Sequence, residues 1–126
     1  MRPAKRVYHL GLIGYPLGHS LSPQLHRAAL ASARLEGDYR LFPIPPGEDG
    51  LAEMSALVGL LHQGELHGLN VTIPHKQYVM SLVDELSEVA RAVGAVNTIY
   101  KSRDDILVGD NTDVPGFLRD LGRLMG

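Results

Sequence analysis

The chain has 126 residues and contains no cysteine, so disulfides, thiolate zinc sites and iron–sulfur clusters are excluded. Its length fits one domain, and its 44% hydrophobic and 21% charged residues are ordinary for a globular protein. A formal net charge of −2, without a long run of basic residues, argues against nucleic acid or an anionic membrane as a partner.

The amino-terminal segment has no recognisable targeting signal. The basic start MRPAKR is followed by an apolar stretch that His9, Gly11 and Gly14 interrupt. The stretch therefore lacks the unbroken apolar core of a secretion signal, and no window resembles a membrane span. We expect a cytoplasmic protein.

Hydrophobic patterning predicts alternating strands and helices in the first half of the chain. An apolar run at residues 7–13 predicts a buried strand, and a loop is expected at residues 14–18. Ser22 and Pro23 are typical of a helix start, and we expect this helix to end near Gly37. Alternation over residues 39–44 predicts a second strand. Residues 51–61 show the 3.6-residue spacing of a second, amphipathic helix.

The second half of the chain continues this pattern and then changes it. A third strand is predicted at residues 68–71, a short helix at about residues 76–83, and another from the cap Ser87 to Gly94. Two runs at 95–100 and 106–109 flank a polar turn and predict a β-hairpin.

A last helix is expected to start near Val114. The whole pattern predicts a single domain over residues 1–126. Its expected fold class is α/β, a three-layer sandwich in which helices flank a mostly parallel mixed sheet.

Three local patterns suggest chemistry that their spacing does not support. The glycines of the first loop read G-x-x-G-x-x-x-G, not the G-x-G-x-x-G of a dinucleotide-binding turn, and Pro16 interrupts them. The segment GHSLS has Ser22 where a nucleophile elbow needs its second glycine. The six histidines form no ligand motif, so we predict no metal site and expect most of them on the surface or on helix faces.

A pair of hydroxyls stands at the start of the first predicted helix. Ser20 and Ser22 can donate hydrogen bonds to a carboxylate, whose charge the helix N-terminus favours. The alternative is that Ser22 is a plain helix cap and Ser20 a loop residue.

Other polar side chains follow the predicted strands. In NVTIPHK, Asn70 and Thr72 offer hydrogen bonds that suit an alcohol-rich ligand, and Lys76 supplies a charge. The alternative is a solvated loop with an ordinary surface lysine. Asn97 lies in an otherwise apolar strand, so it is either a structural bridge or a ligand contact. Asp113 in GDNTD is either part of a site or the cap of the last helix.

Four segments occur together in the order and spacing of one enzyme family. They are HSLSP, NVTIPHK, GAVNT and GDNTDVPGF, at residues 19–23, 70–76, 94–98 and 109–117. From about Val7 onward the chain resembles the N-terminal, substrate-binding domain of the shikimate dehydrogenases. The resemblance implies an NADP-dependent reduction of 3-dehydroshikimate to shikimate in aromatic amino-acid biosynthesis.

The resemblance also implies a role for each matching residue. Ser20 and Ser22 would hold the shikimate carboxylate, while Thr72, Asn97 and Asp113 would bind the ring hydroxyls. Lys76 would be the catalytic lysine, working with Asp113. Asn70 would only support the loop.

Ketone reduction needs a hydride on carbon and a proton on oxygen. We expect Lys76 to deliver that proton, because a nearby aspartate favours its ammonium form. The NADP(H)-binding Rossmann domain of the family is absent from these 126 residues, so we expect no bound cofactor and no turnover by the chain alone. Apolar surface left without that domain would favour self-association.

Other functions stay open on the sequence alone. One is a stand-alone module that binds a small carboxylate or polyol, and another is a structural or interaction domain. The serine pair favours shikimate over quinate, but a quinate/shikimate dehydrogenase domain is a further alternative.

Overall fold

A computed structural model of the protein describes residues 7–18, 22–113, 118–119 and 121–123, with the side chain of Ser22 left out. Within these residues, six strands form one sheet in the order β2-β1-β3-β5-β6-β4. They are β1 (Val7–Gly14), β2 (Glu36–Pro43), β3 (Gly68–Val71), β4 (Glu85–Leu86), β5 (Thr98–Lys101) and β6 (Leu107–Asp110).

The strand directions give a mixed sheet. Strand β1 pairs in parallel with β2 and β3, and β4 pairs in parallel with β6. Strand β5 is antiparallel to both of its neighbours, β3 and β6. The predicted α/β fold, mostly parallel with an antiparallel portion, is confirmed.

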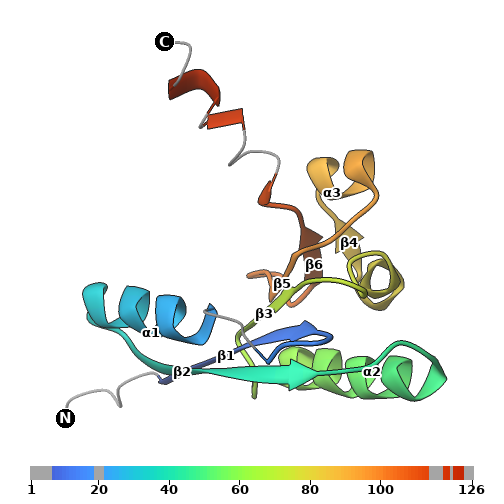
Figure 1. Ribbon diagram of the computed structural model, residues 1–126, viewed down its shortest axis with the longest axis horizontal. Helices are drawn as coiled ribbons and strands as arrows, with labels where there is room; N and C mark the ends of the chain where they lie inside the picture. Colours follow the sequence, from blue (N-terminus) through green and yellow to red (C-terminus); the bar gives the residue numbers. More distant parts are fainter. Residues whose placement is uncertain (1–6, 19–21, 114–117, 120, 124–126) are drawn as a thin grey trace.

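Helices cover both faces of the sheet, as Figure 1 shows for the half built from β1 and β2. The described helices are α1 (Ser22–Ser32), α2 (Glu48–Gln63), the 3₁₀ helix η1 (Tyr78–Leu82) and α3 (Glu88–Val93). None of them is long and apolar enough to cross a membrane.

Alternation along β1 divides the core in two. Leu12 packs with Leu17 and Tyr39 on the α1 side, where His26 of α1 stacks on the Tyr39 ring. The next residue, Ile13, points to the other face and joins the larger core beneath α2. A period of two in a strand buried on both faces produces this arrangement.

The predicted boundaries of α3, which rest on capping residues, agree with the structure. The Ser87 hydroxyl accepts a hydrogen bond from the Ala90 amide at 3.1 Å, so it caps α3 as expected. Gly94 closes the same helix in the left-handed conformation, with φ of 77°. The third strand lies where the sequence predicts it. The hairpin of β5 and β6 also forms as predicted, although β5 begins at Thr98 and not at residue 95.

The predicted end of the first helix was wrong. Helix α1 stops at Ser32, and Arg34 takes the left-handed position with φ of 59°. The amides of Arg34 and Leu35 then bond to Ala31 and Leu30 in a Schellman motif. Gly37 serves a different purpose, because a Cβ there would lie 2.4 Å from the Tyr8 carbonyl oxygen of the neighbouring strand.

Other boundaries also differ from the predictions. The second strand begins at Glu36 and the second helix at Glu48, both earlier than expected. The short helix expected at 76–83 is the 3₁₀ helix η1, and the two-residue strand β4 was not predicted. Asp113 and residues 118–119 and 121–123 are helical, while the expected start of the last helix near Val114 lies outside the described residues.

Strand direction brings three loops to one end of the sheet. Strands β1 and β3 are parallel, and β6 runs the same way because two antiparallel steps separate it from β3. The loops after β1, β3 and β6 therefore lie at the same end of the sheet, together with the segment that enters β5. The polar motifs of the sequence lie in these loops.

Tyr39 links the α1-side core to this end of the sheet and gives a testable prediction. Its side chain is buried, and its hydroxyl donates to Asn70 Oδ1 at 2.9 Å. Tyr39→Phe should lower the free energy of unfolding at pH 7 by about 1–2 kcal/mol, because Asn70 loses this donor. Urea unfolding would measure it, with Tyr100→Phe at an exposed site as the control.

The same variant also tests a dependence on pH. Burial raises the pKa of Tyr39 to about 12, from an ordinary value of 10.0. The unfolded chain loses this proton first as the pH rises, so Tyr39 destabilises the fold progressively between about pH 10 and 12. The Tyr39→Phe variant should show a smaller loss of stability over this range. An equal loss in both proteins would contradict the assignment.

Candidate functional site

Two backbone hydrogen bonds connect the ends of β1 and β3 and the loops that follow them. The Thr72 amide donates to the Ile13 carbonyl at 2.8 Å, and the Tyr15 amide donates to the Ile73 carbonyl at 3.0 Å. Gly14 allows this approach, because a Cβ there would lie 2.3 Å from Thr72 Cγ2. The first loop therefore fixes the position of Thr72.

The backbone around Lys76 is held from two sides. His75 is buried, and its Nε2–H donates to the Ile44 carbonyl. On the other side, the Val96 amide donates to the Lys76 carbonyl at 2.9 Å. His75 is an exception to the expectation that most histidines lie at the surface or on helix faces, and no periodicity in the sequence distinguishes it.

Asn97 bridges the segment before β5 and the loop after β6. Its Oδ1 accepts from the Thr98 hydroxyl and from the Thr112 amide, both at 3.0 Å. Its Nδ2 donates to the Thr112 hydroxyl at 3.1 Å, and only 8% of the residue is exposed. One of the two interpretations of Asn97, the structural bridge, is therefore confirmed. The amide nitrogen carries a second hydrogen that these bonds do not use.

Asn70 supports the same region, as expected. Besides accepting from Tyr39, it donates to the Asn97 carbonyl at 3.5 Å and to the Thr98 hydroxyl at 3.4 Å. Its bonds thus connect the α1-side core to the segment that carries Asn97.

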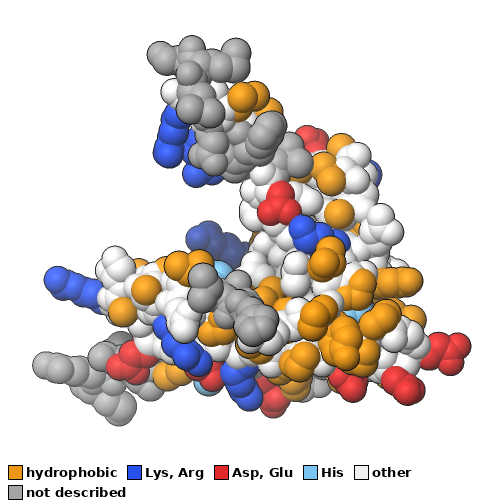
Figure 2. Space-filling model, in the orientation of Figure 1, with side chains coloured by type: hydrophobic (Ala, Val, Ile, Leu, Met, Phe, Trp, Pro, Cys, Tyr) orange, Lys and Arg blue, Asp and Glu red, His pale blue; other side chains and the backbone are white. Residues whose placement is uncertain are grey.

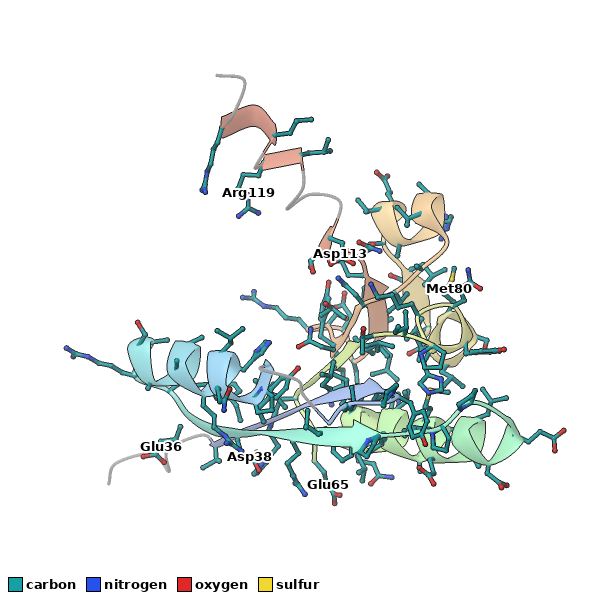
Figure 3. The ribbon with its side chains drawn as sticks, in the orientation of Figure 1. Glu36, Asp38, Glu65, Met80, Asp113 and Arg119 are labelled. Atoms are coloured by element: carbon teal, nitrogen blue, oxygen red, sulfur yellow. The ribbon has the colours of Figure 1, made fainter. Side chains whose placement is uncertain are left out.

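An ion pair joins two of these loops. Lys76 Nζ donates to Asp113 Oδ2 at 2.9 Å, across 37 positions of sequence. The two side chains are 30% and 60% exposed, so a ligand can reach both. Figure 3 shows Asp113 just beyond the end of β6, on the far side of the sheet from Asp38.

The structure thus brings four of the predicted site residues to one end of the sheet: Thr72, Lys76, Asn97 and Asp113. Ser20 lies outside the described residues. Ser22 begins α1, but its side chain is not described. Whether Asp113 also caps the last helix involves residues outside the described ranges.

Two other pairs of charged side chains are candidate sites, but neither lies among the loops that carry Thr72, Lys76, Asn97 and Asp113. A hydrogen bond from His9 lowers the pKa of Asp38, but this pair is exposed at the opposite end of β1. A hydrogen bond from Lys101 lowers the pKa of Asp105 in the hairpin turn. Among the described residues, no three His, Asp or Glu side chains are arranged to hold a metal ion.

Comparison with protein families gives a clear match. The family model described as the shikimate dehydrogenase substrate binding domain matches residues 12–99. This range contains Thr72, Lys76 and Asn97 but ends before Asp113.

The similar proteins of known classification are shikimate dehydrogenases, in agreement with the family model. A shikimate dehydrogenase (NADP(+)) of Synechocystis sp. is 49% identical over 112 residues, which cover 89% of this chain and 37% of the relative. Its counterpart in Dictyoglomus turgidum is 42% identical over 119 residues, which cover 94% of this chain and 40% of the relative. The chain therefore spans about two fifths of the length of these relatives.

Solved structures agree in fold. Shikimate 5-dehydrogenase from Listeria monocytogenes, in complex with shikimate and NAD, matches with a TM-score of 0.81 at 32% identity, over 98% of this chain and 42% of that one. The enzyme from Thermus thermophilus, in complex with NADP(H) and shikimate, matches with a TM-score of 0.78 at 34% identity, over 92% of this chain and 42% of that one.

The different environments of Asn97 and Lys76 predict different effects on stability. Asn97→Leu leaves the Thr112 amide without its acceptor and should lower the free energy of unfolding by about 1–3 kcal/mol. Lys76→Met breaks only an exposed ion pair and should change it by less than about 1 kcal/mol. Urea unfolding of both variants would measure this, and equal losses would contradict the bridge.

Proposed function

Because this chain belongs to the family of shikimate dehydrogenase substrate binding domains, we propose that it binds shikimate and 3-dehydroshikimate as the substrate half of an NADP(H)-dependent dehydrogenase. The observation that carries the proposal is the Lys76–Asp113 pair, at 2.9 Å, beside Thr72 and Asn97. We propose further that residues 1–126 act as one substrate-binding domain.

Substrate binding divides into two parts. Ser22, which begins α1, and Ser20, two positions before it in the sequence, would donate to the carboxylate of shikimate, whose charge a helix N-terminus favours. Thr72, Asn97 and Asp113 would bind the ring hydroxyls. The Asn97 amide hydrogen that takes part in no bond among the described residues and the exposed carboxylate of Asp113 support this division, because one donates and the other accepts.

Lys76 would handle the proton of the reaction. A lysine held 2.9 Å from an aspartate can polarise a ketone oxygen and give it a proton as hydride reaches the carbon. In the reverse direction the same nitrogen would receive the hydroxyl proton. Asp113 would orient the lysine and a neighbouring substrate hydroxyl.

The loop at Gly14 does not fit the pyrophosphate of NADP(H), the cofactor that would supply the hydride. A dinucleotide-binding turn needs a glycine loop whose backbone is open to the pyrophosphate. Beside Gly14 that space is filled, because a Cβ would lie 2.3 Å from a Thr72 carbon and 2.9 Å from a Leu17 carbon. This turn would therefore not hold the cofactor, and we propose that the 126 residues alone would not turn over.

Two alternatives to this function have separate consequences. A stand-alone module for a small carboxylate or polyol would bind ligand at the same residues without taking part in reduction. A quinate/shikimate dehydrogenase domain would accept both acids. The predicted pair of serines, in place of a serine and a threonine, favours shikimate.

Self-association and a cytoplasmic location are further proposals. An apolar groove of about 300 Å³ lies between β2 and α2, with Leu41, Phe42 and Leu57 among its lining residues. Figure 2 shows hydrophobic side chains gathered over this part of the surface. Such a surface favours association.

Binding can be tested on the 126-residue chain itself. Isothermal titration with shikimate should give weak saturable binding, and Ser20→Ala with Ser22→Ala should abolish it by removing the donors to the carboxylate. Arg103→Ala, in the hairpin turn far from the site, is the matched control. A wild-type chain with no detectable binding would contradict the proposal, and quinate in a parallel titration would reveal the broader specificity.

Proton transfer can be tested in a dehydrogenase that contains this chain as its substrate half. Lys76→Met should lower kcat by about 10²–10⁴-fold, the usual contribution of general acid catalysis, with a much smaller change in KM. The rate of NADPH oxidation with 3-dehydroshikimate measures both constants. Equal losses in kcat and in binding would instead assign Lys76 to binding alone.

A further inference from the structure

Asn111 is a buried amide next to the candidate site that the proposed function does not use. Only 3% of the residue is exposed, although it lies in a loop between two polar neighbours. Its Nδ2 donates to the Ala95 carbonyl at 3.1 Å, and its Oδ1 accepts from the Asp113 amide at 2.9 Å. Both ends of the side chain therefore hold backbone groups.

The segment that Asn111 reaches also holds Lys76. The Val96 amide, next to Ala95, donates to the Lys76 carbonyl at 2.9 Å. A short series of hydrogen bonds thus runs from the Lys76 backbone through residues 95–96 to Asn111, and from there to the backbone of Asp113. The two members of the ion pair are attached to one common piece of chain.

The ion pair cannot fix this geometry by itself. Its side chains are 30% and 60% exposed, and exposed pairs contribute little because water and salt screen them. The bonds of Asn111 are shielded from water. Hydrogen bonds in such a buried environment are stronger than hydrogen bonds that water surrounds. The buried amide is thus the better candidate for holding the carboxylate in place.

Asn97 does not duplicate this arrangement. Its side chain runs in the opposite direction, from the segment before β5 to the amide of Thr112. Asn111 runs from the loop after β6 back to Ala95 and is the described side chain that bonds the Asp113 amide. The two asparagines cross between the same two segments, but Asn111 acts directly on Asp113.

We propose that Asn111 is a positioning residue, which holds Asp113 in register with Lys76 for proton transfer; this inference rests on the proposed function. Asn111 would not touch the substrate. Its loss would let the carboxylate shift relative to the lysine, and a misplacement of about 1 Å costs roughly 10²-fold in rate.

Three variants separate this role from simple stability. Asn111→Ala removes both bonds, whereas Asn111→Asp keeps an acceptor for the Asp113 amide and loses the donor to Ala95. The matched control is Asp84→Ala, because Asp84 Oδ2 accepts from the Leu107 amide at 2.9 Å at the other end of β6. That control removes a similar bond without touching the site.

The first readout needs no substrate. In the 126-residue chain, hydrogen exchange of the Asp113 amide should become roughly tenfold faster in Asn111→Ala, and stay slow in Asn111→Asp and Asp84→Ala. Unchanged exchange in Asn111→Ala would overturn the proposal. This readout keeps its meaning even if the wild-type chain does not bind shikimate, which would refute the proposed function alone.

The second readout is catalytic, in a dehydrogenase that contains this chain. Asn111→Ala should lower kcat by about 10–10²-fold with little change in KM, and should alter the pH profile of kcat, since the paired groups no longer meet. Asn111→Asp should lose less activity than Asn111→Ala. A kcat loss no greater than that of Asp84→Ala, or an unchanged pH profile, would show a merely structural role.

Discussion

The candidate site depends on the short segment at residues 95–97, which lies between the loops that carry the lysine and the aspartate. Its backbone bonds to β3 through the Val71 amide, to β6 through the Asp110 carbonyl, and to the Lys76 carbonyl. These bonds are largely buried, so water does not compete for them. An exposed ion pair has no such protection, and its 2.9 Å contact is a consequence of this scaffold.

Capping and alternation made much of the fold predictable. Ser87 and Gly94 bound α3 as their chemistry demands, an apolar run predicted β1, and alternation predicted β2, although that strand begins earlier, at Glu36. The sequence misled where a glycine served packing instead of a helix end, as at Gly37. The left-handed backbone of Arg34, which ends α1, could not be predicted from the sequence, because residues other than glycine rarely adopt this conformation.

The site was less accessible to sequence reasoning than the fold. Motif order indicated which residues belong together, but taken singly Lys76 and Asp113 were better interpreted as a surface lysine and a helix cap. The bonds that connect their backbones run through residues 95–96 and Asn111, and His75 separately attaches the lysine loop to Ile44. All of them depend on contacts between segments far apart in the chain. Local periodicity carries no information on such contacts. The family model spans residues 12–99, a range that includes Thr72, Lys76 and Asn97, whereas Asp113 lies beyond it and is joined to them by its contact with Lys76.

The central claim is that this end of the sheet is a binding site for shikimate. Titration of the isotope-labelled chain with shikimate, followed by amide NMR, tests it directly. The account predicts that the shifts concentrate in the loops after β3 and β6 and in the segment before β5, and that Lys76→Met weakens them. Shifts confined to the groove between β2 and α2, or no saturable shifts at all, would contradict it.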